Sequence, residues 1–188
     1  MKTTLKHIVK IQTGIFAQTG SEGEIVYLQA RHFNEQGQLH AVLHPDVKKG
    51  DINERHLLRP GDILFAAKGT KNFATRYESN NEPAVASTSF FVIRLKDDLH
   101  QPILTGYLVW YINQPVSQKF LKGNAIGTSM ASISKSVLEE LEVSIPDLKT
   151  QEIILSIVKL RNREKQLRAR LDILKEQQLQ QILINVIK

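Results

Sequence analysis

The stretch IGTSMASISKSVLEELEVSIPDLKTQEIILSIVKL, residues 126–160, decides which fold this 188-residue chain adopts. Its first half predicts a loop of small residues, a short helix or turn over 136–141 and an apolar strand over 141–145. After the break at Pro146-Asp147, a helical pattern begins, with Thr150 as its predicted N-cap and Glu152 in its first turn. No Gly or Pro follows Pro146, so the helix is expected to continue to the last residue.

An apolar seam follows this helix at alternating steps of four and three residues, the spacing of a coiled coil. It comprises Ile153, Ile157, Leu160, Leu167, Leu171 and Leu174, with Glu164 as its one polar member. The helix would be about 55 Å long, which is more than a small domain can cover. Its first two turns could pack on the rest of the chain, but for its distal half the sequence predicts a helix–helix partner.

The upstream residues predict a mixed α/β (α+β) globular head with mostly antiparallel strands. Strands are expected at 8–12, 24–29, 62–67 and 88–95, with turns at Asn34–Gly37 and Pro60-Gly61. A helical pattern over 102–120 contains Pro115, which should break or kink it. We therefore expect a globular domain over 1–148 and a coiled-coil-forming helix over 149–188.

Composition limits the class of protein. The net charge is +6, and residues 151–188 hold eight Lys or Arg against four Asp or Glu. A basic helix can bind nucleic acid, but coiled-coil flanks are also basic, so charge alone does not indicate DNA binding. The absence of Cys excludes disulfides and thiolate zinc sites, and the apolar runs are too short to cross a membrane. The simplest expectation is a cytoplasmic bacterial protein with no membrane partner.

Three segments combine the residue types that contact DNA. Lys68–Arg76 follows a buried strand and holds three cations without an acid, while 29–34 and 122–129 mix small, polar and basic residues near strand ends. Cations neutralise phosphates, and Arg, Lys and Asn also reach base edges. The alternative for each segment is an ordinary solvated connection. The candidate DNA-binding residues are Arg31, Asn34, Lys68, Lys71, Asn72, Arg76, Lys122, Asn124 and Ser129.

The sequence gives little support for a catalytic or metal-binding site. No Gly-rich nucleotide fingerprint is present, and no methyl-donor pocket or Asn/Asp-Pro-Pro-aromatic loop of an adenine methyltransferase is visible. His40 and His44 are read as solvated loop residues. Asp46-Val-Lys48 is half of a nuclease carboxylate–lysine set, but it lacks an acidic partner to hold magnesium. We expect no catalytic residue, no bound metal and no cofactor on this chain.

The motifs GDILFAAKGT (61–70) and GTSMASISKSVLEELEVSIP (127–146), followed by Gln151 in a long helix, resemble the specificity subunit of type I restriction–modification systems. VKIQTGIFA (9–17) and EIVYLQARHFNEQGQL (24–39) resemble the opening of that family. The usual subunit has two recognition domains and two spacer helices, whereas this chain has one of each. It therefore resembles a half-length specificity subunit.

The resemblance implies a role for each part. Residues 1–148 would be a target recognition domain that reads one half of a bipartite site in double-stranded DNA, and 149–188 a spacer and dimerisation helix. A methyltransferase subunit, and a restriction subunit where one is present, would supply S-adenosylmethionine, Mg²⁺ and ATP. A half-length chain would rebuild the two-part reader as an antiparallel homodimer. Its seam would comprise Ile157, Leu160, Leu167, Leu171 and Leu174.

Two other functions remain open at this stage. One is a stand-alone small nuclease that uses Asp46 and Lys48. The other is a coiled-coil adaptor without a nucleic-acid role, which would show no salt-dependent affinity for DNA.

Overall fold

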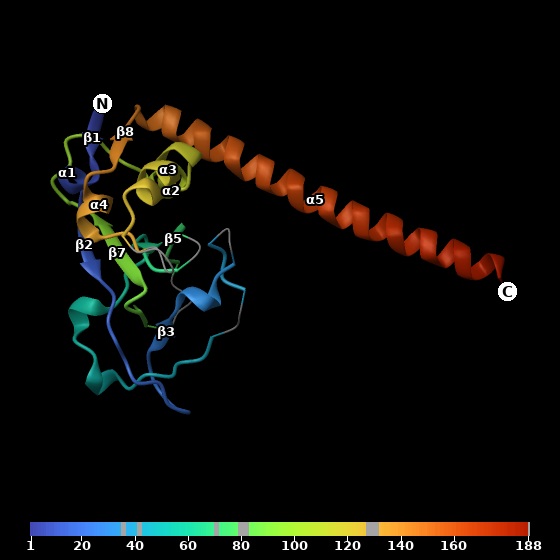
Figure 1. The fold of residues 1–188 in the computed structure, drawn as a ribbon, viewed down its shortest axis with the longest axis horizontal. Coiled ribbons are helices and arrows are strands. Elements are labelled where there is room, and N and C mark those ends of the chain that lie inside the picture. The colour runs from blue at the N-terminus through green and yellow to red at the C-terminus, as the bar shows by residue number, and fades with distance from the viewer. Residues whose placement is uncertain (35–36, 41–42, 70–71, 79–82, 127–131, 188) are drawn as a thin grey trace. The chain divides into compact units, whose positions relative to one another are not determined.

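The computed structural model describes residues 1–34, 37–40, 43–69, 72–78, 83–126 and 132–187. Contacts group the chain into two compact units, Met1–Leu148 and Lys149–Lys188. The first is a mixed α/β head, as the sequence predicts, and the second belongs to a single long helix (Figure 1).

A four-stranded antiparallel sheet with the strand order β2-β7-β4-β5 forms the centre of the head. Its strands are β2 (Val9–Thr13), β7 (Phe90–Leu95), β4 (Ile63–Ala66) and β5 (Ala74–Arg76). The predicted strands near β2, β7 and β4 are confirmed. Strand β5 was read as part of a polar loop, because three residues carry too little pattern to indicate a strand.

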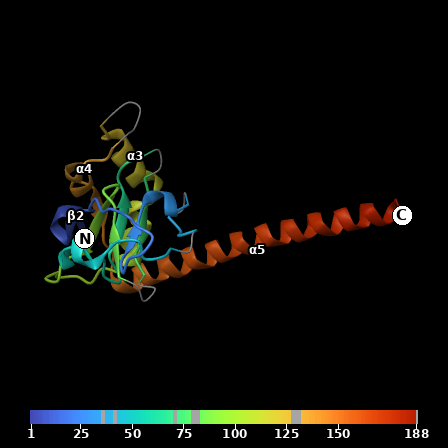
Figure 2. The same ribbon diagram turned by 90° about the horizontal axis from the view of Figure 1, so that it is seen from below.

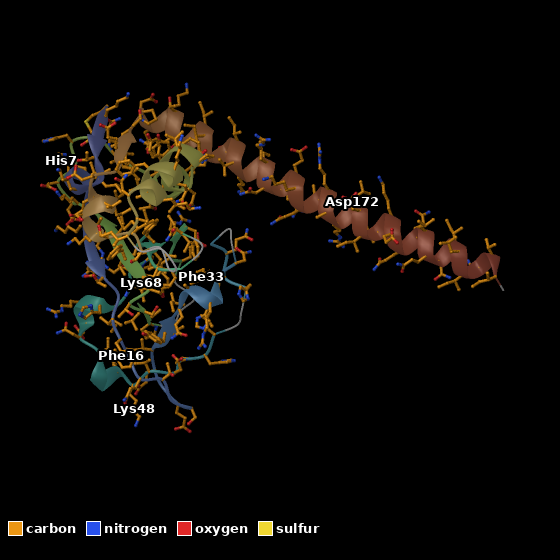
Figure 3. All side chains as sticks on the ribbon, viewed as in Figure 1. His7, Phe16, Phe33, Lys48, Lys68 and Asp172 are labelled. Atoms are coloured by element: carbon orange, nitrogen blue, oxygen red, sulfur yellow. The ribbon has the colours of Figure 1, made fainter. Side chains whose placement is uncertain are left out.

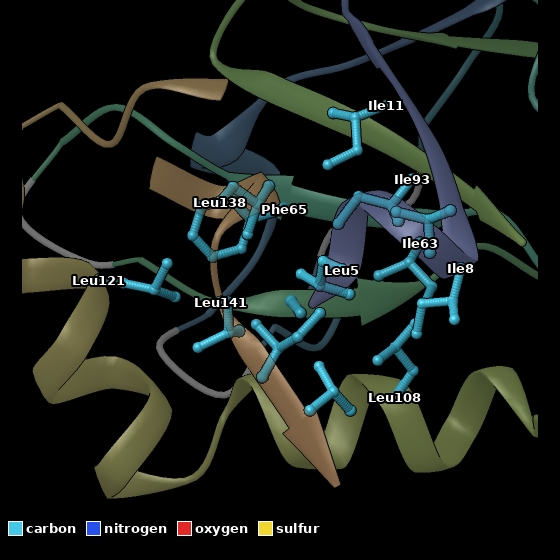
Figure 4. Packing of buried hydrophobic residues seen from close by; sticks show 14 of the residues in the cluster. Leu5, Ile8, Ile11, Ile63, Phe65, Ile93, Leu108, Leu121, Leu138 and Leu141 are labelled. Carbon is cyan, nitrogen blue, oxygen red and sulfur yellow. The ribbon is translucent and has the colours of Figure 1, made fainter. Parts of the chain in front are cut away.

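Helices cover one face of the sheet and enclose the larger apolar core. The layer consists of α1 (Leu5–Ile8), α2 (Thr105–Ile112), α3 (Pro115–Gly123), α4 (Lys135–Glu139) and the pair β1 (Lys2–Thr4) and β8 (Glu142–Ser144). Figures 1 and 2 show α3 and α4 on the same side of the head. Figure 4 shows sheet residues such as Phe65 and Ile93 in one cluster with Leu121 and Leu138.

Pro115 ends one helix and begins the next. The predicted helical pattern over 102–120 forms α2 and α3, and Pro115 stands in the first turn of α3. Proline fits there because the first N–H groups of a helix have no partner within it. The break lets α3 turn back over the core, where Leu121 is fully buried.

The opposite face of the sheet packs on a second, smaller layer. Alternate sheet residues, Leu64, Ala66, Phe90 and Val92, meet β3 (Val26–Leu28) and β6 (Ala84–Ala86) in a separate cluster. Strands β3 and β6 pair in parallel, in contrast to the antiparallel pairing of the four-stranded sheet. The described parts of the connections contain three short 3₁₀ helices: η1 (Ala30–His32), η2 (Lys49–Asp51) and η3 (Glu54–His56).

Two predicted turns depend on glycine. Gly37 has φ of +72° and donates its N–H to the carbonyl of Asn34 at 3.0 Å. Gly61 has φ of +93° and donates to the carbonyl of Tyr77 at 3.0 Å, which closes the open end of the β4–β5 hairpin. Both backbones lie in the left-handed region that glycine adopts readily.

A buried ion pair joins Asp62, the residue directly before β4, to Arg94 on β7. Asp62 is 2% exposed, and its two carboxylate oxygens accept Nε of Arg94 at 2.7 Å and Nη2 at 2.5 Å. The backbone N–H of Arg59 also donates to this carboxylate, at 2.9 Å. The hydrogen bond to Asp62 is the largest cause of the raised pKa of Arg94.

The second unit is helix α5, which spans Leu148–Val186 without a break. The predicted N-cap at Thr150 is wrong, because Thr150 already lies inside the helix and Glu152 falls beyond its first turn. Asp147 directly precedes the helix and is as suitable a cap type as Thr. The seam residues of α5 each expose between 50% and 69% of their surface, and they are Ile153, Ile157, Leu160, Leu167, Leu171 and Leu174.

Candidate nucleic-acid interface

The loop of the β4–β5 hairpin, residues 67–73, is the centre of the candidate interface. Lys68 (labelled in Figure 3) is exposed at the end of β4 and bridges to Ser132. The next residue, Gly69, has φ of +113°, and no heavy atom of the described residues beyond its chain neighbours lies within 4 Å of the position that a Cβ would take. Backbone and cation are therefore both accessible to a phosphate at this point. Lys71 lies outside the described residues.

Asn72 helps to shape this loop. Its Nδ2 donates to the carbonyl of Ala66 at 2.9 Å, and the side chain is half-buried. Without a rearrangement of the loop, a contact of Asn72 with a base would have to use its Oδ1 or the second N–H of Nδ2. The structure gives this residue a positioning role that its sequence context did not indicate.

Arg76 does not belong to the same loop. It lies in β5 opposite Ile63, so it stands at the other end of the hairpin from Lys68. Its guanidinium forms an ion pair with Glu78. Lys68 and Arg76 were predicted to share one cationic loop, and the strand separates them by about 16 Å, five residues at about 3.3 Å each.

Aromatic packing brings the second predicted segment, 29–34, to the hairpin. Phe33 (Figure 3) contacts Phe73 and Phe90, with ring centroids 5.8 and 5.6 Å apart. Arg31 is exposed in the 3₁₀ turn η1 just before Phe33. Asn34 closes the following turn through its Oδ1, which accepts the N–H of Gln38 at 2.9 Å.

A glycine allows this turn to lie against the hairpin. A Cβ on Gly37 would sit 2.8 Å from Cδ2 of Phe73 and 3.2 Å from Cβ of Thr75. The turn can therefore approach β5 closely only because residue 37 lacks a side chain. The segments around Arg31 and Asn72 are thus held next to each other.

The third predicted segment lies on the other side of the hairpin loop. Lys122 and Asn124 are exposed at the end of α3, and Nδ2 of Asn124 donates to the carbonyl of Phe120 at 2.8 Å. The chain then returns through a bridge between Ile126 and Ser132, and the N–H of Ile133 donates to the carbonyl of Ala67 at 2.9 Å. Ser129 lies outside the described residues.

Asn113 is a structural residue of this region that its sequence context does not predict. Its Oδ1 accepts the N–H of Ala74 at 2.8 Å, and its Nδ2 donates to the carbonyl of Ala74 at 2.8 Å. The backbone N–H and C=O of Ala74, on the edge strand β5, are thereby both paired with Asn113 at the end of α2. The only sequence signal was an Asn at a helix end, which does not indicate a contact 39 residues away.

Charge around the loop favours an anion. Residues 99–138, which include α2, α3 and the return to α4, contain no Asp or Glu. Lys119 and Lys122 are both exposed on α3. Together with Lys68 they make this part of the surface attractive to phosphate.

His32 holds the 3₁₀ turn that carries Arg31. Its Nδ1 accepts the backbone N–H of Gln29 at 3.2 Å, which requires an unprotonated nitrogen. Burial, followed by the cation of Arg31, lowers the pKa of His32 below its ordinary 6.5, while Asp46 opposes the shift. The unfolded chain therefore binds the proton more readily than the folded chain.

This difference predicts that the folded state loses stability as the pH falls below about 6.5. The change His32→Asn keeps an acceptor for the Gln29 N–H but removes the titrating group. We expect the midpoint of urea unfolding to depend less on pH in this variant than in the wild type, between about pH 5.5 and pH 7.5. Equal pH dependence in the two proteins would contradict the assignment.

The nuclease alternative of the sequence analysis rests on Asp46 and Lys48. In the described part of the chain, no group of three or more His, Asp or Glu side chains could hold a metal ion. The Asp46 carboxylate accepts the backbone N–H of Tyr27 at 3.0 Å.

No helix among the described residues is long and apolar enough to span a membrane.

Comparison with solved structures shows the same fold. The chain is similar to the type I restriction–modification S subunit from M. genitalium (TM-score 0.58, 16% identity), covering 87% of this chain and 39% of that one. Values are similar for the HsdS subunit from Thermoanaerobacter tengcongensis: TM-score 0.58, 15% identity, and 87% and 37% coverage. A structure from work on complex assembly and conformational transition of the type I R-M system gives TM-score 0.57, 15% identity, and 87% and 38% coverage.

The chain thus spans less than two fifths of the length of these solved proteins. A comparison with curated protein sequences gave no match. A family model described as the type I restriction modification DNA specificity domain matches residues 2–182, so the chain belongs to that family.

Proposed function

We propose that this chain is the sequence-specific DNA-binding subunit of a type I restriction–modification system and reads one half of a bipartite target. The family match over residues 2–182 carries the proposal. The described parts of three segments that the sequence marks for DNA contact also flank one hairpin, through the Phe33–Phe73 contact and the bridges of Ser132 to Lys68 and Ile126. Exposed cations of these segments include Lys68 and Lys122. A surface with such cations suits a polyanion.

Within this interface the residues divide by the contacts they can make. Lys68 and Lys122 are exposed cations suited to phosphate, and Lys71 is proposed for the same role. Arg31 and Arg76 can reach base edges, and Asn124 and Ser129 are further candidates in the return from α3. Asn34 and Asn72 fix the shape of their loops.

Salt dependence tests this assignment. Replacing Lys68 and Lys122 with Ala should lower affinity for all duplexes alike and reduce the slope of log affinity against log salt by about 1.8, since each lost phosphate contact removes about 0.9. Fluorescence anisotropy with labelled duplex between about 50 and 200 mM salt measures the slope. Lys10→Ala is the matched control, because Lys10 is exposed on β2 at the far edge of the sheet.

A slope equal to that of the wild type would place the DNA-binding surface elsewhere on the head. An absence of salt-dependent affinity in the wild type itself would favour the coiled-coil adaptor.

The chemistry is expected on other subunits. The family is a specificity domain without a cofactor of its own, and S-adenosylmethionine, Mg²⁺ and ATP belong to methyltransferase and restriction subunits. This chain would direct the methyltransferase to its target adenine. Its own residues would supply recognition and no catalytic group.

Two copies of the chain are needed to read both halves of such a target. Helix α5 offers the surface for pairing, because its seam residues Ile157, Leu160, Leu167, Leu171 and Leu174 are each at least half-exposed. An antiparallel pair of helices related by a two-fold axis would bring two heads to one palindromic bipartite site. Within one chain, Glu164 on this seam accepts Nη2 of Arg168 at 2.6 Å, so its charge is already compensated.

A further inference from the structure

An exposed ion pair at the end of β5 has a geometry suited to reading a base. Nε and Nη2 of Arg76 both donate to Oε1 of Glu78, with the Nε–Oε1 distance at 3.2 Å. The side chains of Arg76 and Glu78 expose 47% and 68% of their surface. Pairs this exposed contribute little to stability, so the contact has no evident structural purpose.

Among the described residues, the contact leaves one edge of the guanidinium without a partner. Arginine presents five N–H groups in a planar fork, and Glu78 engages only the edge formed by Nε and Nη2. The other edge, formed by Nη1 and Nη2, carries two parallel donors. This is the edge that matches O6 and N7 of guanine in the major groove.

The surroundings of the pair are concave. Arg76 and Glu78 line a cavity of about 670 Å³ between β5 and the segment after η1. Its apolar wall includes Phe33 and Leu64, while Gln38 and Thr75 add polar groups. Arg76 is about 16 Å along the hairpin from Lys68. The major groove of a duplex is about 12 Å wide. A phosphate of one duplex could therefore lie against Lys68 while a base of the same duplex lies against Arg76.

We propose that Glu78 is a positioning residue that fixes Arg76 for recognition of a guanine in the target half-site. The inference rests on the proposed DNA-binding function. A carboxylate at the interface also repels phosphate, so it reduces general affinity while it orients the base-reading group. Glu78 would therefore increase sequence discrimination at the expense of affinity.

The test compares base preference among variants of the full chain. Wild type, Arg76→Ala, Glu78→Ala and Glu78→Gln each select from a randomised duplex library, and competition binding then measures the guanine-containing duplex against one with that base pair replaced. Glu140→Ala is the matched control, because Glu140 forms an exposed pair with Lys6 at 2.7 Å, with exposures of 56% and 43%. Thermal melting establishes that each variant is folded.

We expect Arg76→Ala and Glu78→Ala to lose discrimination at the same base pair, by about 5- to 150-fold. Glu78→Ala should also bind unrelated duplex about twofold to fivefold more tightly, since one negative charge is removed. Glu78→Gln keeps the acceptor oxygen and should retain most of the discrimination. The double variant Arg76→Ala/Glu78→Ala should discriminate no worse than Arg76→Ala, because the two residues act through one contact.

Two results would overturn the inference. If Arg76→Ala changed only the salt slope and left base preference intact, Arg76 would be a phosphate contact. If Arg76→Ala lost the preference but Glu78→Ala did not, Glu78 would not position it. In both cases the proposed DNA-binding function still holds if the wild-type protein selects a half-site from the library. If the wild-type protein selects no half-site, the proposed function itself is contradicted.

Discussion

The double substitution Leu167→Asp and Leu174→Asp should convert the protein into a folded monomer and weaken its binding to a bipartite target by at least about 100-fold. Both leucines are half-exposed on α5, at 51% and 52%. In the proposed homodimer the change places four carboxylates in an apolar seam. Full burial of each leucine is worth about 1.5–3 kcal/mol, and an unpaired buried charge adds a further cost.

A matched control lies on the other side of the same helix. Asn162→Asp with Ala169→Asp adds the same two carboxyl groups, also seven residues apart, at exposed positions about half a turn from the seam. This control should remain dimeric and bind as the wild type does. Light scattering gives the oligomeric state and anisotropy gives the affinity.

Two outcomes would contradict the dimer. One is a wild type that is monomeric at tens of micromolar, and the other is a seam variant that stays dimeric. Loss of DNA binding by a seam variant that is also unfolded would be resolved by its circular dichroism spectrum, since the head contributes strands that α5 does not.

The substitution Asp62→Ala should lower the free energy of unfolding by about 3–5 kcal/mol. Asp62 is almost fully buried, and the change leaves both the guanidinium of Arg94 and the backbone N–H of Arg59 without their acceptor. The side chain of Arg94 is 28% exposed and can turn partly to water, so the lower end of the range is expected. Total stabilities of about 5–15 kcal/mol make such a loss large enough to threaten folding.

Urea unfolding followed by circular dichroism measures this loss. Glu140→Ala serves as the comparison, since the exposed pair of Glu140 with Lys6 should be worth about 1 kcal/mol or less. If Asp62→Ala cost no more than Glu140→Ala, the buried ion pair would not be a main support of the sheet.

Local patterns in the sequence were enough for most elements of the fold. The apolar runs around Ile63 and Ile93 form the expected strands, because each is a continuous row of side chains that must be buried. Pro115 separates two helices for a reason that is local to one residue, its missing N–H. Gly37 and Gly61 likewise adopt the positive φ that their turns require.

The differences between the predicted and the observed elements have equally local causes. Strand β5 is three residues long and its pattern is too short to recognise, so Arg76 was read as part of a loop. At the start of α5, two residue types suited to capping, Asp147 and Thr150, stand three positions apart. The helix begins after the earlier one.

The sequence by itself determined the longer apolar strands β2, β4 and β7, the uninterrupted helix α5 with its apolar seam, the excess of cations and three polar segments suited to DNA. Only the tertiary structure decided how these segments meet. The packing of Phe33 on Phe73, the clamp of Asn113 on Ala74 and the pairing of β3 with β6 each join residues that are 39 to 58 positions apart. Such contacts depend on shape and hydrogen bonding between distant parts of the chain, and residue periodicity carries information only about near neighbours.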